Sequence, residues 1–188
     1  MMMNRLAGGM GALVVSVAVL PAISVSAAAA PIAAPATSVA GQDVLRDGGV
    51  WYFKAKHSGK CLTVHGGSTA KGAAVDQYTC LNRSNQRWRL LYTSQWGVAY
   101  VIAEHSGKCL DALGGGKANG TKIVQWDCNS RSNQSFHVRN LSGYVALKPL
   151  HAAHKCLDVP GASQRNNTQL VLWSCKSVSN QQFKMVRA

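Results

Sequence analysis

From about residue 50 to its end, the chain alternates short apolar runs with clusters of glycine, asparagine and serine. The runs VAYVIAEH (98–105), KCLDAL (108–113), TKIVQWDC (121–128) and SFHVRNL (135–141) are rich in β-branched or aromatic residues. The polar clusters separate them at the spacing expected of an all-β barrel or sandwich. Matching segments precede and follow these four, so the pattern predicts an all-β fold of about twelve strands.

The N-terminal part has a different pattern. A short basic start (1–5) precedes an almost uncharged apolar run (6–25) and a stretch of small residues (26–30), which is the layout of a secretory signal. The apolar run is also long enough to span a bilayer, but its glycines and Pro21 argue against a lasting helix, and no basic stop-transfer cluster follows. We therefore expect a cleaved signal over 1–30, an Ala/Pro-rich linker over 31–49 and one folded domain over 50–188. The mature protein is then expected to be secreted and to leave no part in the membrane.

A threefold internal repeat organises the expected domain. Its copies read HSGKCLTV…DQYTC…SNQRW (57–88), HSGKCLDA…VQWDC…SNQSF (105–136) and HKCLDV…VLWSC…SNQQF (154–183). A period of about 47 residues across three units indicates a repeat architecture.

The six cysteines follow the same repeat. Six cysteines allow 15 pairings, and the sequence alone does not choose among them. The identical spacing of 19 residues favours one disulfide within each unit. The expected pairs are Cys61–Cys80, Cys109–Cys128 and Cys156–Cys175. There is no CxxC and no Cys/His cluster at zinc spacing, so we expect neither a metal nor another cofactor.

A Q-x-W-like triplet ends each unit, as Gln86-Arg87-Trp88, Gln134-Ser135-Phe136 and Gln181-Gln182-Phe183. Together with C-L-D and an aromatic residue two positions before the second cysteine, it resembles the ricin-B-type β-trefoil lectins. It is similar in particular to the family 13 carbohydrate-binding modules of secreted bacterial proteins, over residues 50 to 188. The resemblance implies a β-trefoil with pseudo-threefold symmetry. It also implies that the triplet glutamines and aromatics are mainly structural, and short-strand alternation places these aromatics in the core.

The resemblance also implies where a sugar binds. Family members place an Asp directly after Cys-Leu, an aromatic residue fifteen positions later, a polar residue after the second cysteine and an Asn four positions further on. A carboxylate accepts hydroxyl protons with charge assistance, an amide donates and accepts, and an aromatic ring covers the sugar face. The positions hold Asp111, Trp126, Asn129 and Asn133 in the second repeat, and Asp158, Trp173, Lys176 and Asn180 in the third. In the first repeat they hold Thr63, Tyr78, Leu81 and Asn85.

We expect the first-repeat pocket to be weak or lost, because Thr63 removes the carboxylate and Leu81 cannot bond a hydroxyl. In all three repeats a glycine stands three positions after the Asp position, where the family often has an amide. Structural alternatives stay open for the other residues: Asp can close a turn, Trp can be a half-buried strand residue, and Asn can cap a turn. His57 and His105, which begin the H-S-G-K turns, are expected to be solvated or turn-bonded.

Composition narrows the function further. The chain has 20 Lys+Arg against 7 Asp+Glu, a formal net charge of +13. A glycosidase needs two carboxylates about 5 to 10 Å apart, and threefold symmetry would put Asp111 and Asp158 in separate lobes. We therefore expect a non-catalytic, monomeric protein that binds a galactose- or xylose-type polysaccharide or glycan.

Two other functions stay open at this point. The positive charge favours anionic partners, so the chain could instead bind an anionic cell-surface or cell-wall polymer, or nucleic acid, although no specific nucleic acid is expected. A trefoil can also serve as an inhibitor or as the receptor-binding component of a toxin.

Overall fold

The computed structural model describes residues 45–188. The signal predicted over 1–30 and most of the predicted linker lie outside the described residues. No helix within 45–188 is long and apolar enough to cross a membrane.

The described part is all-β, as predicted. It contains thirteen strands and six three-residue 3-10 helices. The strands are β1 (Arg46–Ala55), β2 (Cys61–Val64), β3 (Val75–Tyr78), β4 (Trp88–Tyr92), β5 (Val98–Ala103), β6 (Cys109–Ala112), β7 (Ile123–Trp126), β8 (Ser135–Leu141), β9 (Tyr144–Pro149), β10 (Lys155–Asp158), β11 (Thr168–Gln169), β12 (Val171–Ser174) and β13 (Phe183–Arg187). The 3-10 helices are η1 (His65–Gly67), η2 (Ser84–Gln86), η3 (Leu113–Gly115), η4 (Leu150–Ala152), η5 (Pro160–Ala162) and η6 (Ser179–Gln181).

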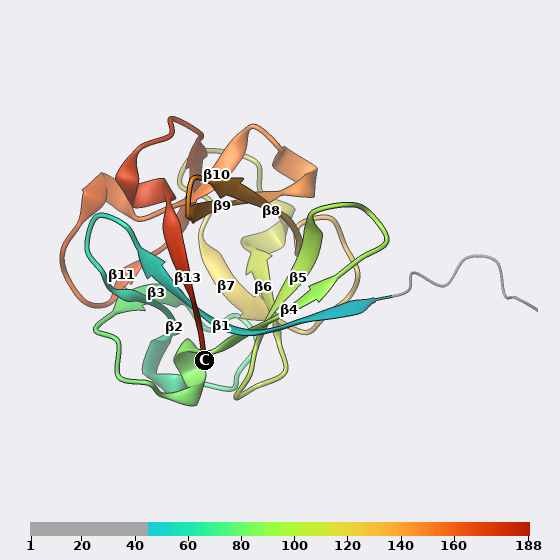
Figure 1. Ribbon diagram of the computed structural model, residues 1–188, viewed down its shortest axis with the longest axis horizontal. Helices are drawn as coiled ribbons and strands as arrows, with labels where there is room; N and C mark the ends of the chain where they lie inside the picture. The colour runs from blue at the N-terminus through green and yellow to red at the C-terminus, as the bar shows by residue number, and fades with distance from the viewer. Residues whose placement is uncertain (1–44) are drawn as a thin grey trace, which may run out of the picture. The chain divides into compact units, whose positions relative to one another are not determined.

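Six of the strands close a barrel. Antiparallel pairing runs from β1 to β4, β5, β8, β9 and β13, and β13 pairs with β1 again. The first and last strands therefore lie side by side and close the ring (Figure 1). Closure leaves these six strands without a free edge inside the ring.

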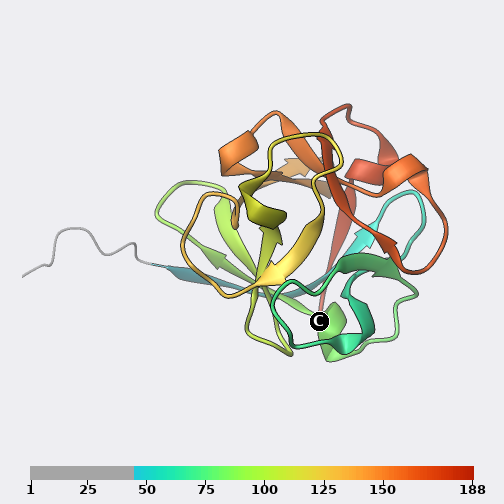
Figure 2. The same ribbon diagram turned by 180° about the vertical axis from the view of Figure 1, so that it is seen from behind.

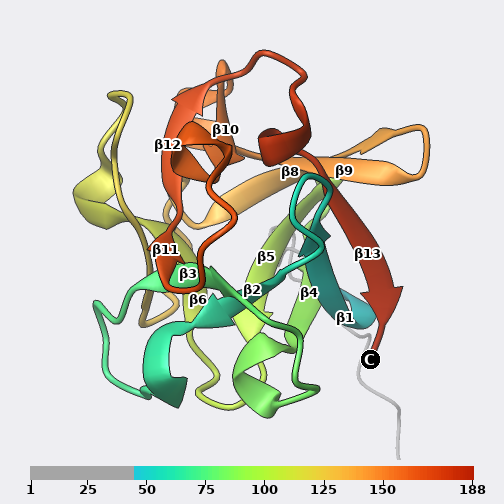
Figure 3. The ribbon, with the colours of Figure 1, turned by 90° about the vertical axis from the view of Figure 1, so that its left-hand side faces the viewer.

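The remaining strands form three hairpins, one in each repeat: β2–β3, β6–β7 and β10–β12. From behind, the three repeats appear as three lobes coloured teal to green, yellow and orange to red (Figure 2). The two-residue strand β11 pairs with β3 and so joins the third repeat to the first (Figure 3). A six-stranded barrel with three hairpins is the predicted β-trefoil.

All three predicted disulfides are present: Cys61–Cys80, Cys109–Cys128 and Cys156–Cys175. Each bridge ties the first or second residue of a hairpin's first strand to a cysteine one or two residues beyond its second strand. It therefore fixes the end of the hairpin from which the predicted binding residues extend.

The triplet aromatics fill the core. Trp88 and Phe136 are fully buried and Phe183 is 1% exposed, as predicted. Trp88 also donates from its indole Nε1 to the carbonyl oxygen of Leu62 at 3.0 Å, which satisfies its buried polar group.

Candidate functional site

The second repeat has a cavity of about 630 Å³ at the end of its hairpin. Asp111 is the third residue of β6, and Trp126 ends β7 opposite Cys109. Both line the cavity together with Asn129 and Asn133, which the loop after β7 supplies. The four residues predicted for this repeat therefore come together in one pocket.

The Asp111 carboxylate is held by two amides. Its Oδ2 accepts hydrogen bonds from Asn133 Nδ2 at 2.9 Å and from Gln134 Nε2 at 2.8 Å. Within the described residues Oδ1 has no hydrogen bond, so it can accept one from a ligand. Burial raises the pKa of Asp111, and the two amide hydrogen bonds offset part of that rise.

The two asparagines of this pocket also form hydrogen bonds with other groups of the protein. Asn133 also donates to the carbonyl oxygen of Ala112, so its Nδ2 is fully used and only its oxygen remains for a ligand. The Asn129 side chain accepts from the backbone N–H of Arg131, while its own backbone N–H donates to Gln134. The Asn129 side chain thus closes a local turn, whereas Asn133 bonds across the hairpin, and both residues also line the pocket.

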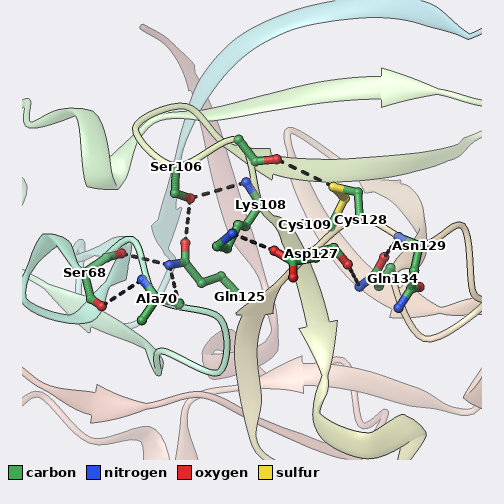
Figure 4. Close-up of polar contacts among 11 residues, drawn as sticks. Ser68, Ala70, Ser106, Lys108, Cys109, Gln125, Asp127, Cys128, Asn129 and Gln134 are labelled. Atoms are coloured by element: carbon green, nitrogen blue, oxygen red, sulfur yellow. Dashed lines mark hydrogen bonds and ion pairs between the residues drawn. A yellow bond between two sulfur atoms is a disulfide. The ribbon is translucent and has the colours of Figure 1, made fainter.

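Gln134 joins these residues, and Figure 4 shows its contacts with Asn129 and Asp127. Its Oε1 accepts from Asn129 and its Nε2 donates to the carbonyl oxygen of Asp127, in addition to Asp111. The triplet glutamine is therefore structural, and it orients the carboxylate without facing the solvent.

The third repeat repeats this arrangement. Asp158, Trp173, Lys176 and Asn180 line a cavity of about 330 Å³. Asp158 Oδ2 accepts from Asn180 at 3.1 Å and from Gln181 at 2.8 Å, and burial raises the pKa of Asp158. Trp173 is 40% exposed, so its ring is open to a ligand.

The first repeat also has a cavity, of about 590 Å³, lined by Thr63, Tyr78, Leu81 and Asn85. Thr63 Oγ1 donates to the backbone oxygen of Cys61 and accepts from Gln86, so its hydroxyl is used inside the protein. The expectation that this pocket lacks a carboxylate is wrong, because Asp76 lines it from β3. Asp76 was missed because it lies outside the C-L-D motif.

Backbone geometry explains the glycine three positions after each Asp position. Gly66, Gly114 and Gly161 have φ values of 59°, 64° and 61°, in the left-handed region that side chains disfavour. A glycine therefore suits the turn that closes each pocket, and it leaves the pocket without a side-chain amide at this position.

A histidine from the following repeat borders two of the pockets, and the sequence did not predict it. His105 lines the first-repeat cavity and His151 lines that of the second. Their ring Nε2 atoms lie 3.0 and 2.9 Å from the carbonyl oxygens of Ser68 and Gly116 in the preceding repeat, and His57 bonds Ser163 in the same way. In each repeat a histidine precedes the first cysteine by four or five residues, and this recurrence could have predicted the contact.

In the third copy the sequence pointed to the wrong histidine. The repeat unit was drawn from His154, but the equivalent of His57 and His105 is His151, which lies in η4. The third copy has an extra residue between this histidine and the cysteine, which shifts the motif.

Glutamines on the hairpins bind neighbouring repeats together. Gln125 on β7 donates to the carbonyl oxygens of Ser68 and Ala70 at 2.8 and 2.9 Å and accepts from Ser106 (Figure 4). Gln77 on β3 does the same toward the third repeat. These bonds fix the back of two hairpins, and hence the pocket walls that the hairpins carry.

A disulfide-bonded β-trefoil with repeat-related pockets of carboxylate, aromatic ring and amide defines a class of protein, the trefoil lectins. The model of the ricin-type β-trefoil lectin domain matches residues 50–183, so the chain belongs to that family. No curated protein matches the chain.

Solved structures agree with this assignment. ThreeFoil, a designed threefold-symmetric protein, is 34% identical, with a TM-score of 0.72, over 74% of this chain and 99% of its own. The exo-β-1,3-galactanase of Clostridium thermocellum is 27% identical, with a TM-score of 0.72, over 76% of this chain; the match spans only 31% of the galactanase. A ricin B-like lectin of Macrolepiota procera, solved in complex with lactose, shares the fold at 18% identity and a TM-score of 0.66, over 76% of this chain and 98% of the lectin. The chain is therefore a carbohydrate-binding lectin domain by family and fold.

Proposed function

We propose that this protein is a secreted, non-catalytic lectin that binds galactose- or xylose-type units of a polysaccharide through the second- and third-repeat pockets. The observation that carries the proposal is the pair of carboxylates, Asp111 and Asp158. Each has one oxygen held by two side-chain amides and a second oxygen without a hydrogen bond in the described residues. Trp126 and Trp173 supply the apolar face that a pyranose ring needs beside such an acceptor.

Two structural relatives support the choice of sugar. One is an exo-β-1,3-galactanase, and another is a lectin in complex with lactose. Both names concern galactose-containing sugars, and the xylose alternative follows from the family resemblance alone.

The distribution of acids supports binding without catalysis. Asp127, which neighbours Trp126 in sequence, does not line the cavity but forms an ion pair with Lys108 at 2.6 Å and is 58% exposed. Asp111 is therefore the only carboxylate among the residues that line the second-repeat pocket. The two-carboxylate mechanism of glycosidases lacks its second group there.

Retention on immobilised galactan and xylan tests the proposal. Asp111→Asn/Asp158→Asn keeps the shape of both side chains, and losing a charge-assisted hydrogen bond at each site should lower affinity about tenfold or more. Asp47→Asn/Asp127→Asn is the matched control, because it removes two exposed acids outside the pockets. If the pocket variant is retained as strongly as the wild type on both polymers, these pockets do not bind the polysaccharide.

A second candidate function is binding of an anionic polymer, and one surface favours it. Trp96, in the turn between β4 and β5, is 90% exposed and borders a cavity of about 230 Å³ with His137, Arg139 and Lys148. No acidic residue lines this cavity. An aromatic face beside cations suits an anionic sugar polymer.

The same retention assay separates the two functions. Charge-driven binding should fall steeply between about 50 and 200 mM salt, should depend on Trp96 and Lys148, and should be insensitive to the Asp111 and Asp158 variants. Pocket-driven binding of a neutral polysaccharide should show the opposite pattern.

A further inference from the structure

The second-repeat pocket contains two cations that have no partner within residues 45–188. Lys117 and Arg131 both line this cavity, and both are exposed. Neither side chain forms a hydrogen bond or an ion pair with another described residue. Asp111 is the only carboxylate that lines the same cavity, so cations outnumber acids in this pocket even without counting His151.

Acids elsewhere on the described surface do not compensate these two cations. The three exposed acids of residues 45–188 each pair with another cation, as Asp47–Arg89, Glu104–Arg87 and Asp127–Lys108. The protein therefore supplies no counter-charge for the cations of the second pocket, and both can bind an anionic group of a ligand.

The cations and the carboxylate occupy different parts of the pocket. Asp111, on β6, is only 3% exposed, whereas Lys117 follows η3 and Arg131 belongs to the loop after β7, both at the surface. Burial raises the pKa of Asp111 and the charge of Arg131 opposes that rise, yet no ion pair joins the two residues. A ligand that enters the cavity can therefore meet a buried acceptor and exposed cations through different groups.

The third repeat has uncharged residues at both positions. Counted from the first cysteine of each repeat, Lys117 corresponds to Gln164, and counted from the second cysteine, Arg131 corresponds to Val178. Val178 lines the third pocket, whereas Gln164 turns away and donates to the carbonyl oxygen of His57. Neither cation is therefore needed to form a pocket of this kind.

The charges of the three pockets differ as a result. With the histidines set aside, Lys176 and Asp158 balance each other among the residues that line the third pocket, and Arg83 and Asp76 do so in the first. Only the second of these pockets has an excess of positive charge. A guanidinium binds a carboxylate or a sulfate through two parallel N–H donors, and an ammonium adds a compact charge beside it.

We propose that the second-repeat pocket binds a galactose-type unit that carries an anionic substituent, a carboxylate or a sulfate, which Lys117 and Arg131 bind while Asp111 accepts sugar hydroxyls. This inference rests on the proposed function, because it names the ligand of a pocket that the proposed function assigns to sugar. It adds that the second and third pockets differ in specificity. The formal charge of +13 favours the approach of such an acidic polysaccharide.

Amide proton–nitrogen correlation spectra of the protein, recorded at neutral pH, test the inference pocket by pocket. The probes are galactose, galacturonic acid and galactose sulfated at its primary hydroxyl, which differ only in the group at that position. Gly114 and Gly161 line the second and third pockets and serve as reporters. At Gly114 the affinity for at least one anionic sugar should exceed that for galactose by about tenfold, the gain of one charge-assisted hydrogen bond. The preferred anionic sugar then identifies the substituent.

Exchanging residues between repeats gives the matched comparison. Lys117→Gln/Arg131→Val places the third-repeat residues in the second pocket and should abolish the preference at Gly114, while Gly161 in the same spectra shows that the variant is folded. Val178→Arg is the reciprocal change. It should raise the preference for the anionic sugar at Gly161 by about threefold or more, and it tests the same position by gain of binding.

A control separates the pocket from the overall charge of the protein. Lys122→Gln/Lys184→Gln removes two exposed lysines that line none of the three pockets, so the preference at Gly114 should stay as in the wild type. An equal loss in this control and in Lys117→Gln/Arg131→Val would overturn the inference, because net charge would then explain the preference.

The remaining outcomes distinguish this inference from the proposed function. If galactose and both anionic sugars bind alike at Gly114, if the preference survives Lys117→Gln/Arg131→Val, or if Val178→Arg leaves Gly161 unchanged, the inference is refuted and the proposed function stands. A response to xylobiose alone has the same meaning. If neither reporter responds to any of these sugars, the proposed function and the inference fall together.

Discussion

At the scale of single residues, Asp111 and Asp158 are buried carboxyls with one oxygen held by two amides and one that accepts no hydrogen bond from the described residues, and burial gives this arrangement an energetic cost. Both carboxyls have a pKa raised chiefly by burial. In the carboxyl range the folded protein therefore binds more protons than the unfolded chain, and this contribution to stability falls as the pH rises. Ionisation of these carboxyls therefore opposes folding, although under the proposed function the same charge strengthens sugar binding.

Because the stability contribution of the two carboxyls falls as the pH rises, we can predict how Asp111→Asn/Asp158→Asn changes the pH dependence of stability. An asparagine oxygen can accept the same two amide hydrogen bonds without bearing charge, so the variant should gain stability relative to the wild type as the pH rises from about 3 to 7, through the carboxyl range. Denaturant unfolding at several pH values measures this difference.

Asp127→Asn is the control with the opposite sign. The hydrogen bond from Lys108 lowers the pKa of Asp127, so its contribution is present at neutral pH and is lost as the pH falls. A stability difference that shrinks with rising pH in the Asp111/Asp158 variant would contradict the burial argument.

The sequence predicted which residues would share a pocket where those residues stand in a repeated motif. Asp111, Trp126 and their third-repeat equivalents were found because three copies could be compared position by position. Asp76 was missed as a pocket residue because it stands in the second segment of its repeat (DQYTC), where the other two copies have Val124 and Val171. It reaches the pocket through the register that pairs it with Thr63. Which residues of the two strands pair is set when the hairpin folds, and the amino-acid composition does not predict it.

At the scale of elements, the disulfide is the constraint that all three hairpins share. Each bridge closes a loop of the same length, 19 residues apart in sequence. In the chain-entropy model, a loop of this length should stabilise the fold by about 3 kcal/mol, equally in each repeat.

Removing one bridge at a time tests this equality. Cys61→Ala/Cys80→Ala, Cys109→Ala/Cys128→Ala and Cys156→Ala/Cys175→Ala should each lower the free energy of unfolding by about 3 kcal/mol and Tm by about 10 °C. Calorimetry of the three variants measures the losses. Losses that differ by more than about 1 kcal/mol would show that local packing, and not loop entropy, governs the bridges.

The sequence anticipated the elements better than their connections. All four segments predicted for the second repeat became strands, β5 to β8, with ends trimmed by a few residues. Strand β11 was not anticipated, because its two residues are ordered by pairing with β3 of another repeat. Contacts between repeats, such as those of Gln77 and Gln125, join a hairpin to a loop of the neighbouring repeat, so they depend on how the repeats pack together.

At the scale of the whole molecule, the threefold arrangement determines how the pockets work together. Each pocket lies at the end of its own hairpin, so the sites belong to different lobes of one rigid trefoil (Figure 2). Under the proposed function, a short sugar occupies one pocket at a time, whereas a repeating polymer can engage more than one. Binding of a second pocket then becomes intramolecular, and avidity can exceed single-site affinity by about 10² to 10⁴.

Loss of a single pocket therefore separates affinity from avidity. Asp111→Asn should leave the affinity of the remaining pockets for lactose or xylobiose unchanged, because the carboxylates lie in separate repeats. Its apparent affinity for the polymer should fall by about tenfold, the loss expected at the altered pocket, because that pocket then adds less to multivalent binding. Calorimetric titration with the short sugar and retention on the polymer measure the two quantities on the same variant, with Asp127→Asn as the control. An equal, small reduction in both would mean that the pockets bind independently and that the trefoil gains nothing from presenting them on one body.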